Sequence, residues 1–353
     1  MAEVQHDNGA EHVVSEKKDL SASDDVPDSF GTMTKDDKRA FILLVVLYAL
    51  QGIPVGLTFG TMPFLLKSHV GYGGLGFFML STYPYSIKLL WSPIVDSYFV
   101  SSWRIPCTKW ELYLGRRKSW IVPVQIIVGL TFIALAKNID ALMERADTLI
   151  SLITCVFFAL ISLAATQDIA LDGWSLTLLS KNSLGYASTA QTIGVNLGYF
   201  MSFTVFLALN SVEACNKYLR WTPKNTPILT LSGYLQMCGV AFICVTLWLL
   251  FYQKEAKESE RMQIREAYSW SRGDKALQPW MVAMVFKLLF AAMSMGVVAG
   301  MSADGSEPIT TSYFLLILFS TILNSFASTV QFVGITAFHT QVADPVMGGT
   351  YMT

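Results

Sequence analysis

The chain has 353 residues, of which 53% are hydrophobic and only 14% are charged, and its formal net charge is −1. Soluble domains carry about 25% charged residues, so this composition argues against a soluble globular protein. A net charge near zero provides no general electrostatic attraction for nucleic acid. The hydrophobic residues are concentrated in long runs, which is typical of an all-α polytopic membrane protein.

The first 39 residues differ in composition from the rest of the chain. They contain ten acidic and five basic residues, with few large hydrophobic side chains. Segments of this kind bury too little apolar surface to offset the entropy lost on folding. We therefore expect residues 1–39 to form a disordered tail.

Eight hydrophobic segments follow, and most have the roughly 20 residues that a helix needs to cross a bilayer. The predicted spans are Ala40–Leu66, Leu75–Val100, Trp120–Ala136, Leu149–Leu171, Leu184–Leu209, Pro227–Tyr252, Pro279–Met301 and Ile309–Phe338. With the N-terminus inside, fifteen Lys and Arg residues lie beside the first span or in the inside loops, and the outside loops hold six. Cytoplasmic loops carry the excess of basic residues, so the N-terminus is predicted to be cytosolic.

A cluster of charges lies at the end of the second span and just before the third. SPIVDS, residues 92–97, contains Asp96, and GRRKSW, residues 115–120, contains Arg116 and Arg117. This pattern resembles the loop signature of the major facilitator superfamily. Bidentate arginine–carboxylate pairs fix the geometry of partly dry sites, so we expect a latch or gate between helices. The simpler interpretation is topogenic charge that contacts lipid headgroups.

The fourth span continues into ATQDIALDGWSLTLLS, residues 165–180. Asp168 and Asp172 are four residues apart and therefore share one face of a helix. Acids at this depth are costly and are functional by default. We expect both to complete the latch, and the alternative is that one carries protons or orients a substrate. Trp174 is expected to anchor the helix at the membrane interface.

Further polar residues lie within the spans. Lys88 is a candidate for binding an anionic substrate, or a structural charge paired with an acid, because a base in a span faces a cavity or a partner. The amides of Gln51, Gln191 and Asn196 are candidates for lining a cavity or for hydrogen bonds between helices. No nucleotide-binding, hydrolase or metalloprotease motif occurs, so nothing favours an enzyme, a cofactor or a metal site.

Several motifs occur together in a fixed order: SPIVDS with GRRKSW, then ATQDIALDGWSLTLLS followed by GYAS, and finally ADPVMGGTYMT. They resemble the acetyl-coenzyme A transporter family of the endoplasmic reticulum, with the bacterial muropeptide permeases as more distant relatives. The resemblance implies a major facilitator-type helix bundle of about twelve spans. It also implies a multi-pass protein of the endoplasmic reticulum membrane that imports cytosolic acetyl-CoA into the lumen, in exchange for CoA.

The family's motif residues map onto this sequence at both ends of the bundle. In the first half they are Asp96, Arg116, Arg117, Gln167, Asp168, Asp172, Gly173 and Trp174. Near the C-terminus they are Asp344, Pro345, Gly348, Gly349, Thr350, Tyr351 and Met352. A polyanion such as acetyl-CoA needs bases and amides, for which the candidates are Lys88, Gln51, Gln167, Gln191, Asn196 and Gln331.

The chain also departs from the family. With about eight spans instead of about twelve, roughly three helices of the C-terminal half are absent beyond residue 275. The expected organisation is a cytosolic tail at 1–39, a six-helix half-bundle at 40–252, a cytosolic linker at 253–278 and a partial second half at 279–353. Alternating access requires two halves. The alternatives are therefore a truncated, non-transporting isoform that assembles with other copies, and a carrier of another solute such as a muropeptide-like anion.

Overall fold

The computed structural model describes residues 33–99, 102–104, 111–113, 115–252, 289–290, 292–293, 311–342 and 349–350. Nearly all of the predicted tail, the predicted linker and most of the seventh predicted span lie outside these residues. Within the described parts, six helices are long and apolar enough to cross a membrane. These helices confirm the all-α polytopic fold class.

The long helices lie where the apolar runs predict them. They are α2 (Lys35–Gly56), α7 (Lys118–Glu144), α8 (Ala146–Leu178), α9 (Tyr186–Phe200), α12 (Leu231–Tyr252) and α14 (Thr311–Val342). Two of them continue through a π-helical turn. Helix α2 continues through η2 (Leu57–Thr61) into α3 (Met62–Leu66), and α9 continues through η6 (Met201–Val205) into α10 (Phe206–Asn210).

The second predicted span is not one continuous helix. It is divided into α4 (Tyr72–Phe78), η3 (Met79–Thr82), α5 (Tyr83–Ile87), η4 (Lys88–Leu90) and α6 (Ser92–Ser97). Pro84 and Pro93 lie in the first turns of α5 and α6, where the missing N–H groups interrupt the hydrogen bonding of a continuous helix. Broken helices are tolerated inside membranes where protein or a cavity surrounds them. The break places Lys88 in a short 3₁₀ turn inside the bundle.

A β-hairpin that the sequence analysis did not predict lies between α6 and α7. Strand β1 (Ser102–Arg104) pairs antiparallel with β2 (Glu111–Tyr113), and Trp103 faces Leu112. Aromatic residues favour strands, which fits the local sequence. The remaining short elements are η5 (Lys181–Ser183), α11 (Val212–Ala214) and η7 (Cys215–Leu219).

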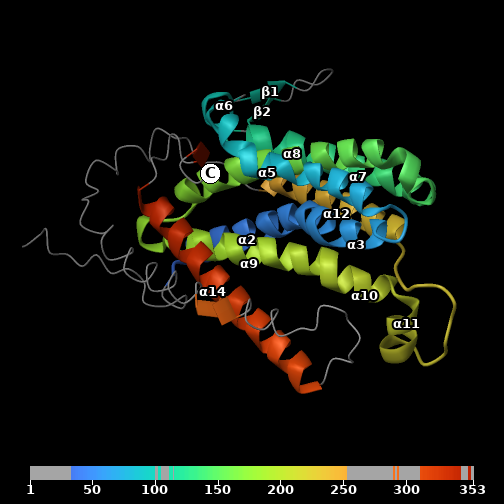
Figure 1. The fold of residues 1–353 in the computed structure, drawn as a ribbon. Helices are drawn as coiled ribbons and strands as arrows, with labels where there is room; N and C mark the ends of the chain where they lie inside the picture. Colours follow the sequence, from blue (N-terminus) through green and yellow to red (C-terminus); the bar gives the residue numbers. More distant parts are fainter. Residues whose placement is uncertain are drawn as a thin grey trace, which may run out of the picture.

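Helix α8 lies at the centre of the packing. It contacts α7, α2 and every part of the broken span, while α2 packs along α9 and α7 packs along α12. Helix α14 crosses obliquely beside α9 (Figure 1). One hydrophobic cluster includes Phe157 and Leu160 of α8, and a second includes Ile169 and Trp174. The predicted acids at 168 and 172 therefore lie inside a packed core.

Glycines allow α2 and α9 to approach each other closely. A Cβ on Gly198 of α9 would lie 2.8 Å from the Cα of Gly52, and a Cβ on Gly52 would lie 3.0 Å from the Cα of Gly198. Both separations are shorter than ordinary van der Waals contact. Small residues at helix interfaces permit this kind of packing in membranes, so the two glycines fix the distance between the helices.

We expect Gly198→Ala to lower the free energy of unfolding by about 1–3 kcal/mol, because the added methyl group separates α2 from α9. Thermal unfolding of the purified chain in detergent measures this change. Gly76→Ala is the matched control, since nothing lies within 4 Å of a Cβ at that position. A loss of stability in the control as large as that of Gly198→Ala would contradict the packing argument.

Candidate functional site

Asp168 of α8 lies in a buried polar network. Its side chain is 1% exposed and accepts a hydrogen bond at each carboxylate oxygen. The Lys88 ammonium group donates to Oδ2 at 2.5 Å, and the Gln51 amide donates to Oδ1 at 2.6 Å. The same amide nitrogen donates to the Tyr85 hydroxyl at 3.0 Å. Side chains from α2, α5 and η4 therefore meet at one carboxylate of α8.

Lys88 is buried and forms an ion pair with Asp168. Its ammonium nitrogen also lies 5.3 Å from the centre of the Tyr85 ring, a cation–π distance. Removing either charge from water costs several kcal/mol, which only a partner charge and further hydrogen bonds offset. Asp168 is therefore the acidic partner expected of a structural lysine at position 88. A role for Lys88 in binding a substrate stays a prediction.

Asp172, one helical turn further along α8, is completely buried. The Tyr48 hydroxyl donates to its Oδ1 at 2.7 Å, and the Gln191 amide donates to the same oxygen at 2.9 Å. Oδ2 has no hydrogen-bond partner among the described residues. Two neutral donors, from α2 and α9, therefore hold this acid.

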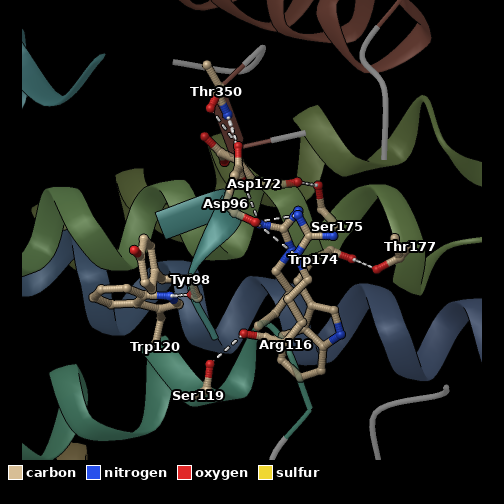
Figure 2. Close-up of polar contacts among 11 residues, drawn as sticks. Asp96, Tyr98, Arg116, Ser119, Trp120, Asp172, Trp174, Ser175, Thr177 and Thr350 are labelled. Atoms are coloured by element: carbon tan, nitrogen blue, oxygen red, sulfur yellow. Dashed lines mark hydrogen bonds and ion pairs between the residues drawn. The ribbon is translucent and has the colours of Figure 1, made fainter. Parts of the chain in front are cut away.

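A second polar cluster surrounds Asp96 near the end of α6 (Figure 2). Arg117 donates to Oδ1 of Asp96 at 2.5 Å, and both residues are buried. The Thr350 main-chain N–H and hydroxyl donate to Oδ2, each at 2.6 Å. Arg116 donates instead to the main-chain carbonyl of Asp96, from Nε at 3.1 Å and also from Nη2.

Two glycines of the predicted motifs leave room for this cluster. A Cβ on Gly173 would lie 2.6 Å from Nη2 of Arg117, so the guanidinium group packs directly against α8. A Cβ on Gly349 would lie 2.8 Å from Oδ1 of Asp96. A side chain at either position would displace the Asp96–Arg117 ion pair. Steric crowding therefore explains why glycine occupies both positions.

The five residues expected to form one latch have different partners. Asp96 is surrounded by Arg116 and Arg117, whereas Asp168 and Asp172 accept hydrogen bonds in the buried network. Arg117 also packs against Gly173, which follows Asp172 on α8. A latch formed by all five residues stays a prediction, and the broken span adds Lys88 as the ion-pair partner of Asp168.

Trp174 and Gln167 also differ from their expected positions. Trp174 is 1% exposed and belongs to a hydrophobic core cluster, so it is not an interfacial anchor. Gln167 is equally buried, and its amide donates to the main-chain carbonyl of Leu47 at 3.4 Å. This glutamine therefore joins α8 to α2 rather than lining the cavity that follows.

A cavity of about 600 Å³ opens between α2, α9 and α14. Three of the predicted substrate-binding candidates line it: Gln191, Asn196 and Gln331. The Asn196 amide is bonded to the Thr192 carbonyl at 2.8 Å, and the buried Oε1 of Gln331 has no partner among the described residues. Gln191 and Tyr85 belong both to the cavity wall and to the buried network. The cavity and the charged centre are therefore neighbours.

The rest of the C-terminal motif lies outside the described residues. These positions are Asp344, Pro345, Gly348, Tyr351 and Met352.

Two tyrosines of the network are not among the residues expected from the sequence. Tyr48 precedes Gln51 by three residues, and Tyr85 precedes Lys88 by three. Residues at this spacing are neighbours on a helix surface. The spacing alone was therefore a usable signal for both.

Comparison with known proteins places these residues in a family context. The family model described as acetyl-coenzyme A transporter 1 matches residues 40–275 and 257–353. An uncharacterized membrane protein of Saccharomyces cerevisiae is 35% identical, over 92% of this chain and 81% of its own length. An uncharacterized protein of Schizosaccharomyces pombe is 32% identical, over 91% and 72%. The anhydromuropeptide permease of Escherichia coli is 26% identical, over 52% of this chain and 33% of the permease.

The alignment with the Saccharomyces protein contains long gaps. It spans 466 residues, more than the 353 residues of this chain, so part of that protein has no counterpart here. The family model also matches in two pieces that meet at residues 257–275. The boundary between the two pieces lies where the sequence predicts absent helices, and the number of absent helices stays a prediction.

The geometry distinguishes the two arginines near Asp96. Arg117→Ala leaves a buried carboxylate without its ion-pair partner, and we expect a loss of about 3–5 kcal/mol in the free energy of unfolding. Arg116→Ala removes hydrogen bonds to a main-chain carbonyl, for which we expect about 1 kcal/mol. Thermal unfolding in detergent compares the two variants. Equal losses would contradict the assignment of Arg117 as the partner of the carboxylate.

Proposed function

Because the chain belongs to the acetyl-coenzyme A transporter 1 family, we propose that it carries acetyl-CoA across the endoplasmic reticulum membrane, from the cytosol into the lumen. The proposed mechanism is alternating access, in exchange for CoA. The bundle of apolar helices and the membrane transport relatives support a multi-pass carrier. The substrate, the direction of transport and the cytosolic N-terminus are the parts that experiment must test.

The observation that carries the proposal is the buried Lys88–Asp168 ion pair beside a cavity lined by amides. Charged groups inside a membrane protein are rare, pair with one another and mark substrate or ion pathways. Acetyl-CoA is a polyanion with a long polar arm. Its phosphates compete with Asp168 for the Lys88 ammonium group, and the amides of Gln191, Asn196 and Gln331 hydrogen-bond to the arm.

The Asp96 cluster supplies the proposed gate. Asp96 and Arg117 come from the proposed first half-bundle, residues 40–252, and Thr350 comes from the proposed second half, residues 279–353. The residues between them, 253–278, form the proposed cytosolic linker. A contact that joins two halves at one end of a bundle closes that end, and its hydrogen bonds must break before the end opens.

Two other functions remain as alternatives, each favoured by one observation. The long gaps against the Saccharomyces relative favour a non-transporting, truncated isoform that assembles with other copies. Similarity to the Escherichia coli anhydromuropeptide permease favours a carrier of a muropeptide-like anion.

Uptake by the purified 353-residue chain in liposomes tests the proposal. We expect saturable uptake of labelled acetyl-CoA that excess CoA inhibits and a muropeptide does not. Lys88→Gln should abolish uptake, because the variant lacks the cation for the substrate phosphates. Lys137→Gln, a change on the exposed face of α7, is the matched control and should retain uptake.

Each other result identifies an alternative. Absence of uptake by correctly folded wild-type protein would favour the non-transporting isoform. Inhibition by a muropeptide but not by CoA would favour the other solute.

A further inference from the structure

Four aspartates are buried in the described parts of the chain, and three of them have donors on both carboxylate oxygens. Asp168 accepts from Gln51 at Oδ1 and from Lys88 at Oδ2. Such an arrangement is expected of an ionised carboxylate, because its charge is shared between both oxygens.

The other two acids with donors on both carboxylate oxygens are Asp96 and Asp37. Asp96 accepts from Arg117 at Oδ1 and from Thr350 at Oδ2. Asp37 accepts from the main chain of Ser180 at Oδ1 and from the Ser180 hydroxyl at Oδ2. Donors therefore reach every oxygen of these three buried acids.

Asp172 breaks this rule. Tyr48 and Gln191 both donate to Oδ1, whereas Oδ2 has no partner in the part of the chain that the structure describes, although the residue is completely buried. The Oε1 atom of Gln191 is also buried and has no donor among the described residues. Two unsatisfied acceptor oxygens therefore belong to the same hydrogen-bonded pair of side chains, and leaving a buried acceptor unpaired is costly.

A proton on Oδ2 of Asp172 satisfies both oxygens together. The protonated carboxyl group becomes a donor at Oδ2 and keeps Oδ1 as an acceptor. Its O–H can donate to Oε1 of Gln191 while the Gln191 amide donates to Oδ1. The carboxylic acid and the amide then form a reciprocal pair, and no buried polar atom of that pair is left without a partner.

The local charges require the same proton. The charged groups that act on Asp172 are Asp168 on its own helix, Lys88 of η4 and Asp96 of α6, and Tyr48 of α2 is a neutral donor. Lys88 is paired with Asp168, and Arg117, which packs against the adjacent Gly173, is paired with Asp96. An ionised Asp172 would be a third buried anion beside two cations, which burial strongly disfavours.

We propose that Asp172 is a proton-binding site, that it holds its proton on Oδ2 against Gln191, and that this proton moves as a coupling ion together with acetyl-CoA in the exchange for CoA. The coupling part rests on the proposed function, whereas the bound proton does not. Gln191 also lines the cavity, so a movement of its side chain would open the buried Oδ2 to cavity water, which then accepts the proton. The resulting Asp172 carboxylate then competes with Asp168 for Lys88 and changes the network around the substrate.

Infrared difference spectroscopy of the full chain in nanodiscs tests the bound proton directly. We expect a C=O band of a protonated carboxyl group that is lost in Asp172→Asn and retained in Asp140→Asn, a change at an exposed position of α7. If Asp172→Asn does not fold, Gln191→Leu serves instead, because loss of the acceptor for the O–H shifts the band to higher frequency. A wild-type spectrum without the band, or a band that persists in Asp172→Asn, would overturn the proposal.

Uptake under an imposed pH difference then tests the coupling. We expect a pH gradient to change the rate of acetyl-CoA uptake by the wild type and to have no effect on Asp172→Asn. Dependence on a sodium gradient instead of pH would overturn the proton as coupling ion. If the wild type does not transport at all, the proposed function fails, while the infrared result still decides whether Asp172 holds a proton.

Discussion

The fold depends on how a membrane bundle accommodates carboxylates away from water. Asp96, Asp168 and Asp172 are each at most 1% exposed, and an uncompensated charge at such a place costs several kcal/mol. Each acid therefore organises donors from other elements of the chain. Around Asp168 and Asp172 these donors come from α2, η4 and α9, so the acids of α8 tie together elements that hydrophobic contact alone would leave free to slide.

The same constraint connects the network with function. Gln191 and Tyr85 contribute both to the network and to the cavity wall, so a solute that moves these side chains also changes the partners of the buried acids. Because each acid has few alternative hydrogen-bond partners, the network has a small number of low-energy arrangements. A small set of discrete arrangements is what a carrier needs in order to alternate between conformations.

Much of the helical framework could be predicted from the sequence, because long apolar runs have few other stable structures in a bilayer. The break near Lys88 was missed, since Pro84 and Pro93 lie within an apolar run whose composition still satisfies a spanning helix. Most of the candidate residues could be identified because a polar or charged side chain is energetically costly inside a membrane. Their partners were not, because hydrogen bonds such as Lys88–Asp168 join positions 80 residues apart in the chain. The burial of Trp174 likewise depends on tertiary packing, which the sequence alone does not show.

A double-mutant cycle on Lys88 and Asp168 measures most directly whether this network organises the bundle. Lys88→Met and Asp168→Leu each leave one buried charge without its partner, and each should lower the free energy of unfolding by about 3–5 kcal/mol. The double variant leaves neither charge, so it should be more stable than either single variant. Losses that simply add in the double variant would contradict the account, because they would show that the two side chains do not interact.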